Sequence, residues 1–299
     1  MKVLLATDGS VHASTAMLTS SRLLRSRDVE ADFLTVSADI RHSDRIDKHL
    51  HLNYRKLVES RANRIVDDAQ RLLARTFLRT NTIVEHGSAS AKLLALAENY
   101  DLTVVGAYGN HDRKQPGLGP VASRLLQHTR SNVLIGRELA NENNYRVLVA
   151  IDSSEASLTA IQAMTSLFDS AALEVTVVHV IETSWASPLS TQSQDDDIDT
   201  SEIEEYEQQL DRELRQTANT VTENALRELE RQSIPANILL KEGEPALEIC
   251  SEADEGGYDL IVVGAAGTPD VKHALLGSVS LKIAWNSPCS VAVIRRAVE

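Results

Sequence analysis

Short apolar runs alternate with longer segments of helical periodicity along the whole chain. In the first half, the runs rich in β-branched residues have the composition of strands, and they lie at 3–7, 31–37, 82–85, 102–107 and 133–136. Between two of these runs, Leu57, Ile65 and Ala69 belong to a set of apolar positions at helical spacing. Strands separated by helices long enough to serve as crossovers predict a parallel sheet covered on both faces.

The second half repeats this alternation, with strand-like runs at 146–151, 174–181, 237–241, 260–265 and 290–295. The letters repeat as well. DLTVVGAYG at 101–109 matches DLIVVGAAG at 259–267 at an offset of 158, and the start of the chain matches the sequence from Arg146 at an offset of 144. The chain is therefore a duplication. We expect an α/β fold with two tandem doubly wound five-stranded parallel sheets and flanking helices.

Changes in the offset locate an insertion in the second copy, and a polar stretch between the copies marks the domain boundary. Ala69 aligns with Ala225 at an offset of 156, so twelve more residues than at the start of the repeat enter the second copy before this point. We place them in the segment 184–200, which is rich in Ser, Asp and Thr and is expected to be a loop. The polar stretch 138–144 is the expected linker. The predicted domains are 1–138 and 145–299.

Two strand ends in each half carry more than packing residues. In doubly wound sheets, ligands bind beyond the carboxyl ends of the strands, where the winding reverses. The first strand is followed by Asp8-Gly9-Ser10 in one copy and by Asp152-Ser153-Ser154 in the other. These residues could cap the next helix or contact a ligand, and the two roles are compatible.

The fourth strand of the second half leads into a glycine run, GAAGTPDVKHALLGS from 264 to 278. Gly264 and Gly267 lack a Cβ and so permit close approach of backbone N–H groups to a ligand. Gly277 and Ser278 come directly before a predicted helix, whose N-terminus favours phosphate. The pattern predicts a phosphate site.

The strand-ending Asp, the G-x2-G-x9-G-S run and the following Val279 and Ser280 resemble the ATP-binding type of universal stress protein, and the duplication resembles its tandem members. The resemblance implies the adenine nucleotide alpha hydrolase-like, Rossmann-like fold. It also implies that Asp152 and the backbone at Val180 hold the adenosine part of ATP, ADP or AMP. The residues that would wrap the ribose and phosphates, with Mg²⁺ as an optional companion, are Gly264, Gly267, Gly277, Ser278, Val279 and Ser280.

The first half keeps most of this pattern and loses one part of it. The positions of a weaker or vestigial site are Asp8, Val36, Gly106, Gly109 and Gly119. Pro120 stands where the second half has Ser278, so a backbone N–H and a hydroxyl disappear together. Proline also starts a helix well, which is an alternative reason for its presence. We expect ATP to prefer the second half.

Composition narrows the function classes. A formal charge of −13 argues against non-specific nucleic-acid binding, which needs a basic face. Cys250 and Cys289 belong to no pairing motif, no apolar stretch approaches the ~20 residues of a membrane span, and Met1 leads straight into a strand pattern. We expect a cytoplasmic protein with no membrane partner.

Other sites fit the sequence less well. No G-x-x-x-x-G-K-[ST] is present, and Gly117 with Gly119 forms a G-x-G that lies too far beyond its strand for a dinucleotide site. We recognise no metal-ligand framework and no set of nucleophile, base and orienting group. We therefore predict that the protein is an ATP-binding regulator or sensor. The alternatives are a slow enzyme that hydrolyses or transfers from ATP and a scaffold that needs no nucleotide.

The last strand of each copy, at 133–136 and 290–294, is apolar and would lie at a sheet edge. Exposed apolar edges favour aggregation, and a duplicated chain can hide both by pairing them. We expect an intrachain pseudo-dimer, with a homodimer as a further level of assembly.

Overall fold

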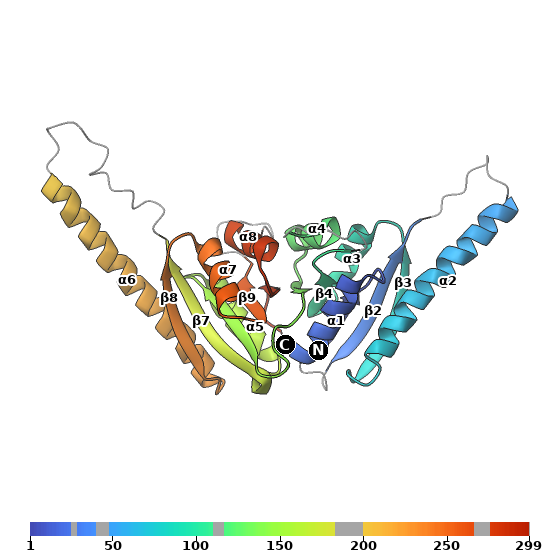
Figure 1. Cartoon of the computed structure of the whole chain (residues 1–299), viewed down its shortest axis with the longest axis horizontal. Coiled ribbons are helices and arrows are strands. Elements are labelled where there is room, and N and C mark those ends of the chain that lie inside the picture. Colours follow the sequence, from blue (N-terminus) through green and yellow to red (C-terminus); the bar gives the residue numbers. More distant parts are fainter. Residues whose placement is uncertain (25–28, 40–47, 110–116, 183–199, 266–275, 299) are drawn as a thin grey trace.

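The computed structural model describes residues 1–24, 29–39, 48–109, 117–182, 200–265 and 276–298. They form a ten-stranded sheet with the order β3-β2-β1-β4-β5-β10-β9-β6-β7-β8 and helices on both faces (Figure 1). All neighbouring strands are parallel except β5 and β10, which are antiparallel. The expected α/β architecture of two doubly wound units is confirmed, and the two five-stranded sheets are joined into one.

The elements of the first half follow the predicted alternation. They are β1 (Lys2–Ala6), α1 (Val11–Leu23), β2 (Glu30–Ser37), α2 (Lys48–Leu72), β3 (Arg79–His86), α3 (Ala89–Ala97), β4 (Leu102–Gly106), α4 (Pro120–His128) and β5 (Asn132–Gly136). Strand β3 is longer than the predicted 82–85. It is an edge strand whose first residues include the exposed Arg79 and Asn81, so the hydrophobic pattern could not reveal its start.

The second half repeats these elements, with one 3₁₀ turn added at Ser170–Ala172. They are β6 (Tyr145–Ile151), α5 (Glu155–Leu167), β7 (Leu173–Ile181), α6 (Thr200–Arg231), β8 (Ala236–Glu242), α7 (Pro245–Glu255), β9 (Leu260–Gly264), α8 (Ser278–Asn286) and β10 (Ser290–Ile294). The expected loop at 184–200 falls almost entirely outside the described residues.

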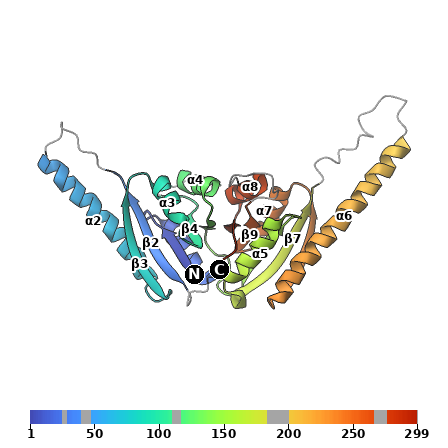
Figure 2. The same ribbon diagram turned by 180° about the vertical axis from the view of Figure 1, so that it is seen from behind.

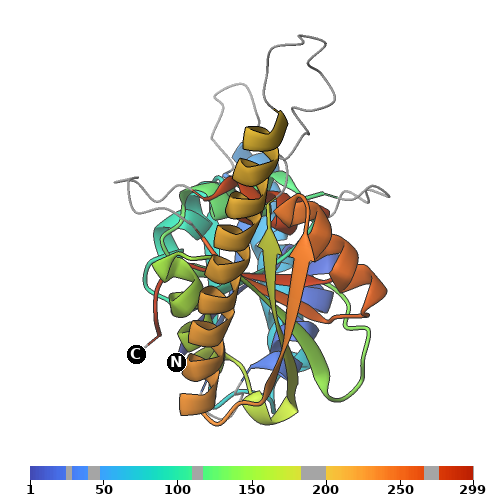
Figure 3. The ribbon, with the colours of Figure 1, turned by 90° about the vertical axis from the view of Figure 1, so that its left-hand side faces the viewer.

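Two hydrophobic layers sandwich the sheet. One layer contains buried residues of α1, α2, α5 and α6, and the other contains those of α3, α4, α7 and α8. At one end of the molecule α6 lies along β7 and β8 (Figure 3). Helices α2 and α6 reach beyond the sheet at the two ends (Figures 1 and 2). Leu50 and Leu57 of α2 are therefore 64% and 65% exposed, although they share the helical pattern of its buried residues.

The two halves meet at the antiparallel pair β5–β10. Val133 pairs with Val293, Leu134 with Ala292, and Ile135 with Val291. At the repeat offset of 158, Leu134 thus faces its own equivalent, so a pseudo-twofold axis passes through this pair. This is the intrachain pairing that the two apolar edge strands predict.

We call the β5–β10 pair and the residues that bond across it the seam. Two equivalent arginines stabilise it. Arg137 follows β5, and its guanidinium donates to the carbonyl oxygens of Ala284 and Cys289 at 3.0 Å each. Arg295 follows β10 and donates to the carbonyl oxygen of Leu126. Ala284 and Leu126 lie in the last turns of α8 and α4, where carbonyl groups lack helical partners and a cation is favoured. Each half therefore caps a helix of the other.

Side chains of the seam strands follow the same symmetry. Asn132 accepts from the backbone N–H groups of Arg295 and Arg296 at 2.8 and 3.1 Å. Ser290, its equivalent, accepts from the N–H of Arg137 at 3.0 Å and donates to its carbonyl at 3.2 Å. The backbone that leaves each last strand is thus held by the other half.

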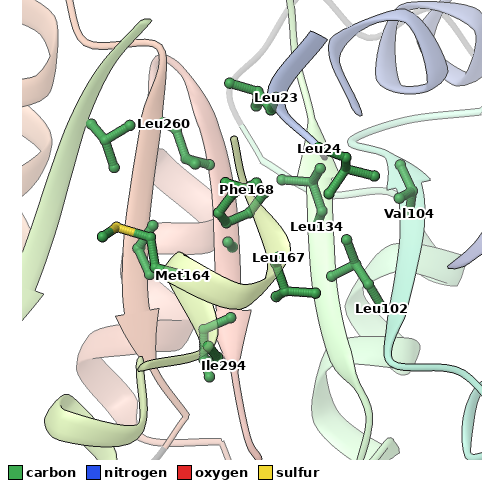
Figure 4. Packing of buried hydrophobic residues seen from close by; sticks show 14 of the residues in the cluster. Leu23, Leu24, Leu102, Val104, Leu134, Met164, Leu167, Phe168, Leu260 and Ile294 are labelled. Atoms are coloured by element: carbon green, nitrogen blue, oxygen red, sulfur yellow. The ribbon is translucent and has the colours of Figure 1, made fainter. Parts of the chain in front are cut away.

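The hydrophobic core crosses the seam. Leu24 and Phe168, which are equivalent at the offset of 144, form an isolated antiparallel bridge. Beside it, the N–H of Asp169 donates to the carbonyl oxygen of Leu23 at 2.9 Å. Leu134 of β5 and Leu167 of α5 are fully buried in the same cluster (Figure 4). The halves therefore share one core on this face of the sheet.

We predict that Arg137→Met lowers the free energy of unfolding by about 2–3 kcal/mol, because it removes charge-assisted hydrogen bonds and leaves buried carbonyl groups without that donor. Burial already lowers the pKa of the Arg137 guanidinium. Urea denaturation measures the change. The exposed Arg124 of α4 is the control, and Arg124→Met should stay within ~0.5 kcal/mol of wild type. Equal effects of the two substitutions would show that the seam does not need Arg137.

Candidate functional site

The predicted site residues gather at one edge of the sheet. In the second half, β6 pairs with β9 on one side and with β7 on the other, so the winding reverses between β6 and β9. Asp152 follows β6, and Gly264 ends β9. In the first half, Asp8 and Gly106 hold the equivalent places after β1 and at the end of β4. The structure thus brings the two sequence signals of each half to adjacent strand ends.

Asp152 is exposed and held by the first turn of α5. Its Oδ1 accepts from the N–H of Ser154 at 3.0 Å, from the Ser157 hydroxyl at 2.7 Å, and from the Ser154 hydroxyl. The Asp152 N–H in turn donates to Ser157 Oγ at 2.8 Å. Ser154 is the N-cap residue of α5 but makes no side-chain cap bond. Its hydroxyl orients the carboxylate, whereas the equivalent Ser10 accepts from the N–H of Ala13 and so caps α1.

The glycines have different local roles. A β-carbon at Gly264 would lie 2.8 Å from the carbonyl oxygen of Ala156, so this glycine lets α5 pack against β9. A β-carbon at Gly106 would meet the backbone of His12 at 2.9 Å in the same way. At Gly109 it would lie 2.6 Å from Asp8 Oδ2, so the loop after β4 comes right up to the carboxylate. At Gly119 it would make only an ordinary 3.4 Å contact.

Helix α8 begins at the site. The N–H of Gly277 donates to the carbonyl of Ala265 at 2.6 Å, which places the helix start next to the end of β9. Gly277 is the N-cap residue and brings no side-chain acceptor, and Ser278 is exposed in the first turn. An N-terminus of this kind can receive an anion.

The remaining predicted residues differ in their burial and in their hydrogen bonds. Ser280 is buried, and its hydroxyl donates to the carbonyl of Gly264 at 2.6 Å, so it fastens α8 to β9. Val279 is half-buried in the first turn of α8, and Val180 is the buried penultimate residue of β7. Gly267 lies outside the described residues.

The site of the first half is a cavity of about 600 Å³. Its lining includes all five predicted positions, namely Asp8, Val36, Gly106, Gly109 and Gly119. Asp8 Oδ1 accepts from the N–H of Ser10 at 3.0 Å. The ring of Tyr108, which also lines the cavity, contacts the ring of His12 edge-on at a centroid distance of 5.5 Å.

Two contributors to the sites were missed by the sequence analysis. Ser157 joins Ser154 in holding Asp152, and Tyr108 lines the first cavity. The repeat offsets could have found both, because Ser157 aligns with Ala13 and Tyr108 aligns with Ala266. A difference between equivalent positions was the available signal.

The two thiols are poor nucleophiles. Burial raises the pKa of Cys289 to about 11, and burial also raises the pKa of Cys250 to about 11. The thiolate is the reactive form, so both groups stay protonated near neutral pH. Within the described ranges, no group of three or more His, Cys, Asp or Glu could hold a metal ion. None of the described helices is both long and apolar enough to span a bilayer.

The fold and the equivalent strand-end residues of its two halves define a tandem α/β protein. The family model described as "Universal stress protein family" matches residues 1–137 and again residues 144–295. The chain therefore belongs to the universal stress protein family.

Individual relatives agree with this assignment. Universal stress protein YxiE of Bacillus subtilis is 31% identical over 150 residues, which cover 50% of this chain and 98% of the relative. Universal stress protein MJ0577 of Methanocaldococcus jannaschii is 33% identical over 94 residues, or 31% of this chain and 58% of the relative. The crystal structure of a universal stress protein from Archaeoglobus fulgidus shares the fold, with a TM-score of 0.64, 19% identity and coverage of 99% and 98% of the two chains.

We predict that Gly264→Ser lowers the free energy of unfolding by about 1–3 kcal/mol, because its side chain would meet the backbone of α5. Gly119→Ser should be neutral or slightly stabilising, since Gly119 is an N-cap position with room for a side chain. Thermal and urea denaturation of both variants test this. Equal stability of the two would mean that the close approach at Gly264 is not a packing constraint.

We predict that iodoacetamide modifies both cysteines slowly in the native protein at pH 8. The thiolate fraction is small at this pH because burial has raised both pKa values to about 11. Mass spectrometry should show full modification only in denaturant. Rapid alkylation of Cys289 in the folded protein at pH 7 would contradict the structural description of this thiol.

Proposed function

We propose that the second half binds an adenine nucleotide, ATP or its products ADP or AMP, and that the protein acts as a nucleotide-dependent regulator or sensor in the stress response. The observation that carries this proposal is the convergence of an oriented carboxylate, Asp152, and an open helix N-terminus, at Gly277 and Ser278, on adjacent strand ends. A carboxylate accepts from hydroxyl groups, and a helix N-terminus attracts phosphate.

Each part of the site would have a defined task. Asp152, fixed by Ser154 and Ser157, would accept from the ribose, and the backbone at Val180 would face the adenine. The glycine run would approach the phosphates, with Ser278 donating from its N–H and hydroxyl. Mg²⁺, where present, would be carried by the phosphates.

Binding rather than efficient turnover fits the described residues best. The two thiols are protonated, and Asp152 Oδ1 is occupied by serine donors. The absence of a disulfide between Cys250 and Cys289 supports the cytoplasm as the place of action. The net charge of −13 supports a small ligand rather than nucleic acid.

Mass spectrometry of small molecules released from the purified protein tests the proposal. We expect unhydrolysed ATP, or ADP or AMP, retained by the chain. Multiple turnovers with Mg²⁺ would instead identify a slow ATP-hydrolysing or transferring enzyme. Failure of both halves to bind any nucleotide would leave a scaffold.

We predict that Ser278→Pro weakens ATP binding about a hundredfold or more. It removes two donors, and a hydrogen bond to a charged group contributes roughly 1.5–3 kcal/mol. The fold should tolerate the change, because proline suits the first helical turn and Gly277 already has the extended φ −61°, ψ 150° that precedes proline well. Calorimetry gives the affinity, and Pro120→Ser is the matched substitution in the first half. Unchanged ATP affinity in Ser278→Pro would exclude the helix start as the phosphate site.

Substitution of two equivalent glycines, one in each half, distinguishes the nucleotide affinities of the two halves. Gly277→Val should abolish tight ATP binding by blocking backbone approach, whereas Gly119→Val should leave it intact. The same calorimetric titration reads both variants. Two equivalent tight sites in the wild type, or loss of tight binding only in Gly119→Val, would reverse the assignment.

A further inference from the structure

The cavity of the first half has an apolar character. Its volume of about 600 Å³ is in the range of small-molecule sites. Leu34, Val36, Leu93, Val105 and Ala122 are among the aliphatic residues that line it. Of the seventeen described residues that line it, only Thr7, Asp8 and Tyr108 have polar side chains. A ring or another flat apolar group could bury most of its surface here.

The first half differs from the second at the positions nearest the helix starts. Helices α1 and α5 have the same length, as do α4 and α8, so the offsets of 144 and 158 pair their residues directly. Ala13 stands in place of Ser157, Pro120 in place of Ser278, and Ala122 in place of Ser280. In the second half the hydroxyl groups of Ser157 and Ser280 donate to Asp152 and to the carbonyl of Gly264, so the donors missing from the helix start of the first half are the hydroxyl and the backbone N–H at Pro120.

The positions that differ are not those expected to hold a nucleoside. Asp8 matches Asp152, and Val36 matches Val180, and both line the cavity. Gly109 still allows the loop after β4 to come up to the Asp8 carboxylate. The groups suited to adenosine are therefore present, whereas the donors suited to phosphate are reduced.

The start of α4 differs from the start of α8 in its donors. Gly119 and Gly277 are both N-cap residues without a side-chain cap, but Pro120 removes the N–H and the hydroxyl that Ser278 has at the first helical position. Asp8, the charged side chain among the described lining residues, accepts from a hydroxyl or amino group.

We infer that the first half binds an uncharged nucleoside and discriminates against its phosphorylated forms. The chain would then hold a nucleotide in one half and a nucleoside in the other. This inference deepens the proposed function and rests on it for the choice of an adenine ligand, but the discrimination against phosphate rests on the residues of the cavity itself.

Calorimetry on the full chain saturated with ATP tests the inference. ATP fills the site of the second half, so the titration measures the affinity of the first half for adenosine and AMP. Adenosine should bind with one site per chain, and AMP should bind this site at least tenfold more weakly. Val36→Phe should weaken adenosine binding at least tenfold by filling the cavity. The matched Val180→Phe should weaken ATP binding instead, and thermal denaturation checks that both variants fold.

A milder variant guards against misfolding of the cavity-filling one. Pro120→Ser restores an N–H and a hydroxyl at the exposed start of α4, and it should narrow the difference between adenosine and AMP at the first site at least threefold. Equal affinity for AMP and adenosine in the wild type would overturn the inference. So would the failure of adenosine to bind ATP-saturated protein, and that result would leave the proposed function standing. If ATP binds to neither half, the proposed function fails. Titration of adenosine into the wild type and Val36→Phe then still measures whether the first cavity binds a nucleoside.

Discussion

The pairing of β5 with β10 is the constraint on which the rest of the structure depends. A strand at the edge of a sheet must be covered or paired, and here the two equivalent edges of a duplicated chain satisfy one another. Arg137 and Arg295 then reach across to the last turns of α8 and α4. These are the helices whose first turns border the two sites. The seam therefore positions the C-terminal ends of the two helices whose N-terminal ends border the sites.

The same seam brings together two helices that border the sites. Helices α4 and α8 lie on either side of the centre of the molecule (Figures 1 and 2). A β-carbon at Gly117 would lie 3.1 Å from Trp285 Nε1, so a side chain of α8 rests against the loop that leads into α4. Gly117 has a φ of +145°, which favours glycine irrespective of that contact. The two halves are thus packed together near α4 and α8, whose first turns differ at Pro120 and Ser278.

Much of this organisation could be predicted from the sequence. The repeat offsets revealed the duplication, the alternation of strands and helices predicted a doubly wound parallel sheet in each half, and Asp152 and Gly264 were expected at one sheet edge. The extent of β3 could not be predicted, because its first residues are exposed and polar. The reach of α2 beyond the sheet was equally hidden, since Leu50 fits the helical pattern and is nevertheless 64% exposed.

The roles of the glycines also needed coordinates. From the sequence, Gly264 and Gly277 belonged to one ligand-binding run, whereas the structure shows that Gly264 is required by the approach of Ala156. Ser280 was expected at the phosphates, and its hydroxyl instead bonds to the carbonyl of Gly264. Both differences arise because a pattern records which residue types are present and not which backbone lies opposite them.

The central claim is that two halves of one fold hold different ligands because their helix starts differ. Native mass spectrometry of the full chain in excess ATP tests this claim most directly, since it counts bound nucleotides per chain. We expect a single ATP per chain. A population carrying two ATP molecules with equal affinity, or a chain that carries none, would contradict it.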